Sequence, residues 1–359
     1  MKTKKIHLSA AILSLLANSA IAQETFELDD IIISGGNSPI KAADLATSNS
    51  VITSDDINKQ GDVTVQSLLR QIPGVAVSSA GSSFTEVRIR GGEANHTLVL
   101  VDGVPATGGD GNYIFSGLSA TEIERIEVMR GPQTIFFGPS ASSGVINIIT
   151  KEPDKNSGTF FGSVGSTRTA GISQDITFGQ VSSSVTIINE DYEGYDQSYS
   201  NGDKDGFNRE TFQIKTKAVT DSGIEMTLKL RDALEKYDTD DLNSSPTSHL
   251  DYVVDTNDEG KRDEFQTSLD LQKSSSSGKT KHSFLIAHTK YSNSLNGIQS
   301  ADNDQELIKY HFQQSLEEKS LLDTAKSVSI VLEHHNDQNQ MNKAQKRRGN
   351  ALAFEYRQK

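Results

Sequence analysis

The sequence has 359 residues, a formal net charge of −13, and neither cysteine nor tryptophan. The length allows about two or three ordinary domains. The acidic balance argues against a nucleic-acid partner, because phosphate binding needs clustered Lys and Arg, and the absence of cysteine suits an oxidising compartment, where stray thiols are a liability.

Residues 1–22 have the pattern of a secretory signal peptide. Three early lysines precede an apolar run over residues 8–17, and Ala20-Ile21-Ala22 supplies a small-residue cleavage site. The apolar run is too short for a membrane-spanning helix, which needs about 20 residues. No later stretch reaches that length. A mature chain that enters a membrane must therefore do so as a β-barrel, whose closed sheet pairs every backbone group.

Residues 23–50 are predicted to be a linker that contains one short apolar strand, Asp30-Ile31-Ile32-Ile33-Ser34. An exposed apolar strand near a terminus is normally an aggregation hazard. It is also what a partner needs for pairing by β-strand addition. The local pattern alone leaves both interpretations open, an ordinary first strand or a partner-binding strand.

Residues 51–151 are predicted to form a compact α/β domain of about 100 residues with its own core. Asp102-Gly103 marks a tight turn between apolar runs, and Gly131-Pro132 ends a strand. The expected helices and strands, in chain order, are helices at 54–57 and 64–69 and strands at 87–92, 97–104, 123–128 and 144–150.

From residue 158 onward, apolar and polar residues alternate strictly in segment after segment. In one of them, Ile224, Met226, Leu228 and Leu230 alternate with polar residues. A soluble sandwich also alternates, but about ten such strands with charged residues on the second face favour a transmembrane barrel. We expect long extracellular loops, such as 194–208 and 237–263, and short periplasmic turns, such as 221–223.

Five blocks within residues 68–150 resemble, in order and spacing, the plug domain of TonB-dependent receptors. They are LLRQIPGV at 68–75, VRIRG at 87–91, LVLVDGV at 98–104, IERIEVMRGP at 123–132 and GVINIIT at 144–150. The resemblance continues more weakly to residue 359.

This resemblance implies an α+β plug domain over 51–151, followed by an antiparallel transmembrane β-barrel. Such receptor barrels have about 22 strands, of which residues 158–359 would supply about ten, so the chain is expected to be an N-terminal part of a receptor. The resemblance also implies a monomer in the bacterial outer membrane. Its transport would be driven by TonB with ExbB and ExbD.

Two sets of residues acquire roles from the resemblance. Asp30, Ile31, Ile32, Ile33 and Ser34 look like the TonB box, which favours the partner-binding interpretation of that strand. Four arginines match plug positions, and because buried cations need partners, we expect barrel carboxylates to face them, some of which would lie beyond residue 359. These arginines are Arg88, Arg90, Arg125 and Arg130.

Within the family, the loops look most like those of the cobalamin receptors. Segments 194–196, 203–207, 236–238 and 254–256 occur in the order of calcium-binding loops. The implied Ca²⁺ ligands are Asp196, Asp203, Asp205, Asp238 and Asp255. Carboxylates on loops suit a hard cation that takes six to eight oxygens. The alternative is a set of solvated acidic loops that bind no metal.

The resemblance places substrate at the apex of the plug, where Gly- and Ser-rich loops can approach a bulky ligand closely. The candidate residues are Ser78, Ser79, Gly81, Ser82, Ser83, Thr107, Gly108, Gly109 and Tyr113, with Tyr237 as a stacking contact.

We therefore expect energy-coupled uptake of a scarce nutrient, with cobalamin as the preferred substrate. A ferric-siderophore or haem receptor shares the plug, but its anionic ligands would favour basic or aromatic loops, and these loops are acidic. A non-transporting porin or adhesin would need neither the plug blocks nor the TonB box. No segment combines a nucleophile, a base and an orienting group, so an enzyme is not expected.

Overall fold

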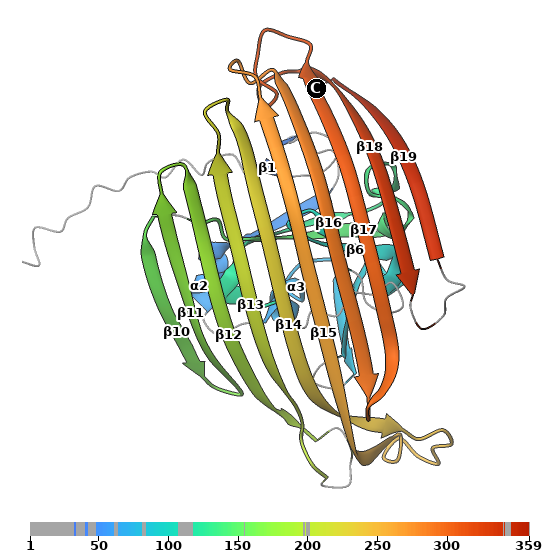
Figure 1. Cartoon of the computed structure of the whole chain (residues 1–359). Coiled ribbons are helices and arrows are strands. Elements are labelled where there is room, and N and C mark those ends of the chain that lie inside the picture. The colour runs from blue at the N-terminus through green and yellow to red at the C-terminus, as the bar shows by residue number, and fades with distance from the viewer. Residues whose placement is uncertain are drawn as a thin grey trace, which may run out of the picture. The chain divides into compact units, whose positions relative to one another are not determined.

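The computed structural model shows two kinds of structure, a small mixed α/β domain and a large antiparallel sheet (Figure 1). Among the described residues, every helix is too short or too polar to cross a lipid bilayer. The described residues are 32–33, 40–41, 48–60, 64–80, 84–106, 118–153, 155–196, 198, 202–339, 341 and 346–358.

Most of the predicted signal peptide and linker lies outside the described residues. Two short strands are described there, β1 (Ile32–Ile33) and β2 (Ile40–Lys41), and they neighbour one another in a two-stranded sheet. Of the predicted TonB box, Asp30, Ile31 and Ser34 lie outside the described residues.

The domain predicted over 51–151 begins at residue 48, and we call residues 48–153 the plug. Its central sheet has the strand order β3-β8-β9-β6-β7, in which β6 and β9 run parallel, and β4 and β5 form a separate hairpin. The elements are β3 (Ser48–Thr53), α2 (Ser54–Gln60), α3 (Val65–Leu69), β4 (Val75–Ala80), β5 (Phe84–Ile89), η2 (Ala94–His96), β6 (Thr97–Val101), β7 (Val104–Pro105), η3 (Ala120–Glu122), β8 (Ile123–Arg130), α4 (Thr134–Phe137), η4 (Pro139–Ala141) and β9 (Gly144–Thr150).

The plug core forms where the apolar runs predicted it. Ile126 and Ile146 of the central strands are fully buried, and Leu68 and Leu69 of α3 pack into the same cluster. Helix α3 begins at a capping box, in which the Thr64 hydroxyl accepts a hydrogen bond from the Ser67 amide at 3.2 Å and the Ser67 hydroxyl accepts one from the Thr64 amide at 3.1 Å. The capped helix predicted at 64–69 is therefore confirmed.

The second part is one ten-stranded sheet in which each strand pairs antiparallel with its neighbours in the chain. We call this sheet the wall. Its strands are β10 (Ser157–Val164), β11 (Thr167–Phe178), β12 (Val181–Tyr195), β13 (Asp205–Val219), β14 (Ile224–Leu242), β15 (Val253–Ser274), β16 (Thr280–Leu295), β17 (Ile298–Ser315), β18 (Lys326–Asn339) and β19 (Lys346–Gln358).

The two faces of the wall differ in the way that the alternation predicts. On β14, Met226 and Leu228 point outward, whereas Arg231 and Glu235 point to the inner face and are buried. Exposed apolar side chains that recur from strand to strand on the outer face of the wall mark contact with lipid. Its exposed members include Ile172, Ile176, Ile187, Phe212, Met226, Leu228, Ile286, Ile308, Leu332, Leu352 and Phe354.

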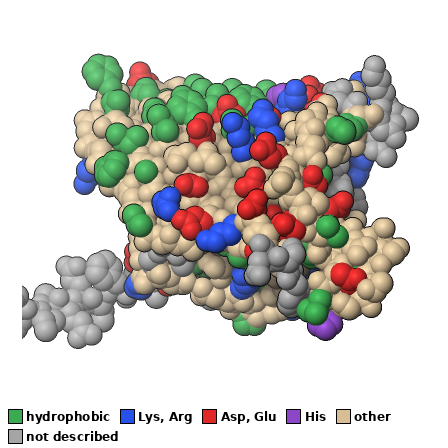
Figure 2. Space-filling model, turned by 90° about the horizontal axis from the view of Figure 1, so that it is seen from below, with side chains coloured by type: hydrophobic (Ala, Val, Ile, Leu, Met, Phe, Trp, Pro, Cys, Tyr) green, Lys and Arg blue, Asp and Glu red, His purple; other side chains and the backbone are tan. Residues whose placement is uncertain are grey.

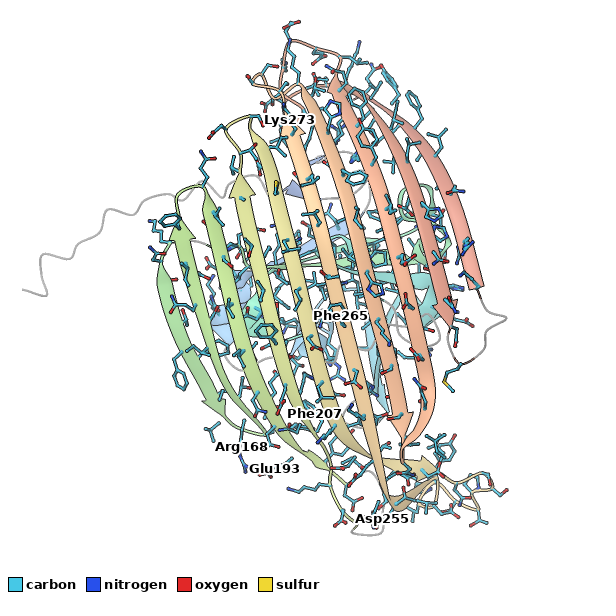
Figure 3. All side chains as sticks on the ribbon, in the orientation of Figure 1. Arg168, Glu193, Phe207, Asp255, Phe265 and Lys273 are labelled. Carbon is cyan, nitrogen blue, oxygen red and sulfur yellow. The ribbon has the colours of Figure 1, made fainter. Side chains whose placement is uncertain are left out.

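The two ends of the wall are also distinct. Lys273 lies at the end that holds the predicted short turn 221–223, and Asp255 lies at the opposite end, where β14 and β15 extend farthest (Figure 3). The prediction of long loops over 194–208 and 237–263 is wrong in part, because cross-strand pairing continues into both segments. Only 196–204 and 243–252 lie between the strands. Charged outward residues such as Asp232 and Lys236 follow the apolar band on β14, so these strand ends stand beyond the lipid.

Candidate functional site

The site begins at the predicted Asp102-Gly103 turn, which joins β6 to β7 on the plug. Both residues have left-handed backbone conformations, with φ of 51° and 81°. Asp102 is held there by Thr150 at the end of β9, whose amide and hydroxyl donate to its carboxylate at 2.9 Å and 2.7 Å. The turn therefore presents a fixed carboxylate at one edge of the plug sheet.

Two wall lysines face this carboxylate. Lys229 Nζ lies 3.4 Å and Lys215 Nζ 3.9 Å from Asp102 Oδ2. Lys215 also donates to the Thr150 carbonyl at 3.0 Å and pairs with Glu152 at 2.7 Å. The side chains of Asp102 and Lys215 are each only 8% exposed, so the cluster is a buried junction between plug and wall.

The charges of this junction decide the protonation of Asp102. Burial by itself would raise the pKa of its carboxyl group. The ammonium groups of Lys229 and Lys215 and the hydrogen bonds from Thr150 outweigh burial and hold the pKa of Asp102 below its ordinary value. Asp102 is therefore ionised at neutral pH and binds both lysines as a charged group.

The predicted plug arginines behave differently from expectation, because their partners in the described residues belong to the plug itself. Arg88 pairs with Glu86 and Arg125 with Glu127, in each case two residues along one strand. Residues two apart on a strand share a face, so each arginine finds its carboxylate locally. Arg90 lies beside the glycines at 74 and 131 in the plug.

Arg130 also stays within the plug, where it donates to the carbonyls of Pro73 and Asn49. The expectation that barrel carboxylates pair with these arginines is thus not met among the described residues. The polarity of the observed junction is the reverse, with the carboxylate on the plug and the cations on the wall.

A second contact between plug and wall is apolar. Val104 of β7 packs with Ala287 of β16 and Leu307 of β17 in one buried cluster. Nearby, Lys309 Nζ lies 6.0 Å from the centre of the Phe137 ring of α4. Strands β13 to β17 therefore hold the plug by an ionic junction at one end and by apolar contact at the other.

The inner face of the wall carries its own buried charge network toward the end where β14 and β15 extend. Glu235 accepts from Arg209 at 2.6 Å and from Arg262 at 2.7 Å. Arg209 also pairs with Glu190 at 3.0 Å. The Glu235 side chain is 2% exposed, so its two arginine partners offset the loss of hydration.

Tyr237, the predicted stacking residue, lies within this network and is 7% exposed. The Arg262 guanidinium lies 4.2 Å from the centre of its ring, and its hydroxyl donates to Asn293 at 3.1 Å. The ring also covers Gly260, its cross-strand neighbour. In this conformation the ring is packed into the wall, and little of it is exposed to a ligand.

The predicted calcium ligands lie at the extended end of the wall. Asp203 donates its amide to the Asp255 carboxylate at 3.3 Å. Burial, together with the charges of Glu259 and Asp203, raises the pKa of Asp238, which stands on β14 beyond the apolar band. These three aspartates are thus neighbours in a region of excess negative charge.

The other two predicted ligands are Asp196 and Asp205. Asp196 accepts a hydrogen bond from the Ser198 hydroxyl at 2.7 Å, and Asp205 is buried at the start of β13. In the described part of the chain, no three carboxylate or imidazole groups converge on one point as a metal site. Any ion here would have to draw the carboxylates together.

An open cavity of about 940 Å³ adjoins these carboxylates, with Asp238, Glu259, Tyr192 and Tyr237 in its lining. Viewed from this end of the molecule, acidic and basic side chains intermingle over the middle, and hydrophobic side chains gather along one edge (Figure 2).

Most of the predicted plug apex lies outside the described residues, namely Gly81, Ser82, Ser83, Thr107, Gly108, Gly109 and Tyr113. Ser78 and Ser79 belong to β4, where they pair with Glu86 and Thr85 of β5. The sequence did not predict the ion pairs of Asp102 with Lys215 and Lys229. The available signals were the Asp-Gly turn and the placement of both lysines on the inner face.

Comparison with known sequences gives the plug a family. Residues 41–145 match the model of the TonB-dependent receptor plug domain. The chain is also 31% identical over 160 residues to the vitamin B12 transporter BtuB of Vibrio vulnificus strain CMCP6. That alignment covers 44% of this chain and 26% of the transporter.

Solved structures share the fold. The siderophore receptor PirA of Pseudomonas aeruginosa is similar with a TM-score of 0.58 and 19% identity, over 87% of this chain and 53% of the receptor. The ferric-catecholate import receptor Fiu of Escherichia coli K12 has a TM-score of 0.60 and 15% identity, over 84% of this chain and 51% of that receptor. The chain thus spans about half the length of these structures and about a quarter of the curated transporter.

Proposed function

This chain belongs to the TonB-dependent receptors of the outer membrane, and we propose that the protein containing it takes up a scarce nutrient with energy delivered by TonB, ExbB and ExbD. The observation that carries this proposal is the junction of Asp102 with Lys215 and Lys229, which holds a folded plug to the inner face of a lipid-facing sheet. A passive porin or an adhesin has no use for such an obstruction.

The proposed coupling runs through the strand at residues 30–34. A short apolar strand next to a linker can be paired by a partner strand through main-chain hydrogen bonds. Tension applied there reaches the plug through the linker, while the lipid-embedded wall stays fixed. This arrangement lets the plug obstruct the barrel at rest and rearrange only when energy is supplied.

The coupling is tested by site-directed cross-linking in the full-length protein, and residues 1–359 contain no native cysteine that would compete with the introduced one. Ser34→Cys should form a cross-link to a cysteine-bearing TonB, and added nutrient should increase its yield. The matched control, Ser54→Cys at the first residue of α2, should not respond to nutrient. Equal yields at both positions would refute pairing at residues 30–34.

The proposed substrate is cobalamin. Its support is the similarity to a vitamin B12 transporter and the acidic extended end of the wall, which suits a neutral or cationic ligand better than an anionic siderophore. Uptake of radiolabelled cyanocobalamin and of ferric siderophores should be measured side by side in cells that lack their own receptors. Uptake of a ferric siderophore alone would replace cobalamin with that class of substrate.

We also propose Ca²⁺ as an ordering ion for the extended strand ends. The donors present fit this ion, because Asp203, Asp238 and Asp255 supply hard oxygen ligands in a region of excess negative charge. Bound calcium would bring these carboxylates together and stiffen the surface that faces the nutrient.

Calcium is tested by calorimetric titration of the purified protein, with and without EGTA, followed by cyanocobalamin. Asp238→Asn and Asp255→Asn should each weaken Ca²⁺ binding. Asp221→Asn, at the short-turn end where Asp221 accepts from Gln180, should leave it unchanged. Cyanocobalamin affinity that ignores EGTA would remove the link between calcium and substrate.

A further inference from the structure

The open cavity of about 940 Å³ at the extended end of the wall lies on the outer face of the sheet. Lys236 and Met226 are separated by an even number of residues on β14, without a break in register, so both side chains point outward. The cross-strand neighbours of Lys236 share this face, and their whole row lines the cavity. The row consists of Asp191, Asn208, Lys236, Lys261 and Ser294.

The next outward row confirms the face on which the cavity opens. Asp238 and Glu259, which lie opposite each other on β14 and β15, also line it. The buried inward residues Glu235 and Arg262 are not among the described residues of the lining. Tyr237 lies between the two outward rows in sequence, so its backbone forms part of the floor. The cavity therefore opens away from the plug.

Irregular strand pairing shapes this depression. The register of cross-strand pairing shifts at three places beside the cavity, between Tyr192 and Tyr195, between Thr239 and Asp241, and between Asn293 and Ser294. A β-bulge bends the strand that carries it and increases the local twist. Because three strands bend at this level, the depression belongs to the backbone and not to side-chain positions alone.

The charges of the lining are arranged so that equal charges face each other. Lys236 lies opposite Lys261, and Asp238 lies opposite Glu259. Like charges at directly opposed positions destabilise a sheet. Lys261 pairs with Asp263 at 2.9 Å, whereas Lys236 has no ion pair within the described ranges. An anionic group bound between the two lysines would relieve their repulsion.

The rest of the lining suits hydroxyl groups. Asn208, Asn257 and Asn296 supply side-chain amides, and Ser294 supplies a hydroxyl group. Amides both donate and accept hydrogen bonds, and carboxylates accept them, so the set matches the hydroxyl and amino groups of a sugar. The cavity is also as large as ordinary ligand sites, which have volumes of about 300–1,000 Å³.

The apolar band of the wall begins beside the cavity on the same face. Next to Lys236 on the outward side of β14 stands Leu234, and beyond Asp232 come Leu230 and Leu228. In Figure 3 the level of the cavity, marked by Phe207, lies between Phe265 near the middle of the wall and Asp255 at the strand ends. A molecule that occupies both surfaces must be amphipathic, with a polar head in the cavity and acyl chains on the band.

We propose that this cavity binds the phosphorylated sugar headgroup of a membrane glycolipid. Lys236 and Lys261 hold its phosphate, and its acyl chains run along Leu234 toward the apolar band. The occupant is a lipid of the surrounding leaflet and not the nutrient, because the cavity opens on the outer face of the wall. The inference goes beyond the proposed function and requires neither TonB, nutrient nor calcium.

Native mass spectrometry of the purified full-length protein in detergent tests this inference, with EGTA present so that calcium takes no part. The probe is an acylated, bisphosphorylated glucosamine disaccharide, and it is compared with its dephosphorylated form and with phosphatidylglycerol. The phosphorylated glycolipid should bind at least severalfold more tightly than either. Equal binding of the dephosphorylated form would exclude the role of the lysines, and equal binding of phosphatidylglycerol would exclude the sugar. Either result would overturn the inference.

Variants locate the bound lipid. Lys236→Gln combined with Lys261→Gln should weaken binding of the phosphorylated glycolipid at least severalfold. Lys236→Arg combined with Lys261→Arg keeps both charges and should bind it nearly as the native protein does. The matched control is Lys273→Gln, which removes an outward lysine at the other end of β15 and should leave the affinity unchanged.

Circular dichroism verifies that each variant keeps its β-sheet content. Native affinity in the double glutamine variant, or an equal loss of affinity in Lys273→Gln, would contradict the proposed site. Added cyanocobalamin should not displace the glycolipid. Displacement would place the nutrient in this cavity and would likewise overturn the inference.

Discussion

The carboxylate of Asp102 on the plug lies 3.4 Å from the ammonium group of Lys229 on the wall, and this pair joins two parts of the chain that are far apart in sequence. Asp102 stands on a left-handed turn and is held by Thr150, so contacts within the plug fix its position. A rigid acceptor and a flexible donor make the pair a defined point of attachment.

The first prediction concerns the removal of this charge. Asp102→Asn should weaken plug docking by about 3 kcal/mol, because Lys229 then loses the carboxylate that it pairs with and Lys215 keeps only Glu152. The measurement is the urea dependence of trypsin cleavage within the plug of the purified protein.

A double-mutant cycle provides the control for that prediction. Lys229→Met combined with Asp102→Asn should be less destabilising than the sum of the single variants, because the second change removes a charge that the first leaves unpaired. Strict additivity would mean that the two side chains do not interact.

The second prediction is a pH dependence with a defined sign. Because the native pKa of Asp102 lies below its ordinary value of 3.8, its contribution to stability is fully present above that pH and is lost as pH falls through the lowered value. Acid should therefore loosen the plug. The measurement is the urea concentration at which the plug unfolds, determined without protease at neutral and at acid pH.

In the Asp102→Asn variant, the stability of the plug should change with pH in the opposite direction. Burial raises the pKa of Glu122 above its ordinary value of 4.5, so its contribution to stability is lost as pH rises through the raised value. With Asp102 neutralised, mild acid should tighten the plug slightly. A variant that keeps the acid sensitivity of the native protein would exclude Asp102 as its origin.

The fold was predictable to the extent that it depends on local pattern. The alternation of Leu228 and Leu230 with Lys229 places the lysine on the inner face, and the Asp102-Gly103 turn follows from the chemistry of those two residues. Neither pattern states which plug residue reaches which wall strand. That pairing depends on how the plug sits against the wall, which is a property of the tertiary structure.

The plug arginines show the same limit of prediction from local sequence. Their positions were expected to face the barrel, but Glu86 and Glu127 stand two residues away on the same strands as Arg88 and Arg125. Each guanidinium is therefore paired with the local carboxylate and not with a distant one. The extended loops were over-predicted for a related reason, since the pairing of β14 with β15 persists through polar residues that look like loop in sequence.

The third prediction concerns the buried network of the wall. Glu235→Gln should lower the free energy of unfolding by about 3–5 kcal/mol, because Arg209 and Arg262 share the lost charge in a buried setting. Glu225→Gln is the matched control, since Glu225 is 51% exposed and its pair with Lys217 is worth about 0–1 kcal/mol. Equilibrium denaturation in detergent, followed by circular dichroism, measures both. Equal effects would show that burial of the network contributes nothing.

The fourth prediction follows from the ring that covers Gly260. A Cβ atom at this position would lie 2.0 Å from the Tyr237 ring, so Gly260→Ala must displace the ring from Arg262 and Asn293. Overpacking of this kind costs about 1–3 kcal/mol. Ser268→Ala, a buried inner-face change on the same strand without a clash, should be milder. The tyrosine signal in near-ultraviolet circular dichroism should change only for Gly260→Ala, and an unchanged signal would mean that the ring is free to move.

The fifth prediction concerns the segment between β14 and β15, which is ordered by a single carboxylate. Asp251 accepts hydrogen bonds from the Thr247 amide at 2.9 Å, the Thr247 hydroxyl at 2.7 Å and the Ser248 amide at 2.6 Å. These bonds lower the pKa of Asp251 to about 2. The segment should therefore keep its order above the ordinary value of 3.8 and lose it as pH falls through about 2.

Proteolysis reads out this order, because Leu250 and Tyr252 are 50% and 56% exposed and flank the carboxylate. Pepsin cleavage at these two residues should accelerate as the pH falls from 3.8 to about 2, beyond the change in pepsin activity on an unstructured peptide of the same sequence. Asp251→Asn should be cleaved quickly across that whole range, because it has lost the charged acceptor that holds the segment. Thr247→Val should be intermediate and Thr247→Ser near native, since only serine keeps the donating hydroxyl. Native resistance in Asp251→Asn would mean that the strands on either side, rather than this carboxylate, hold the segment in place.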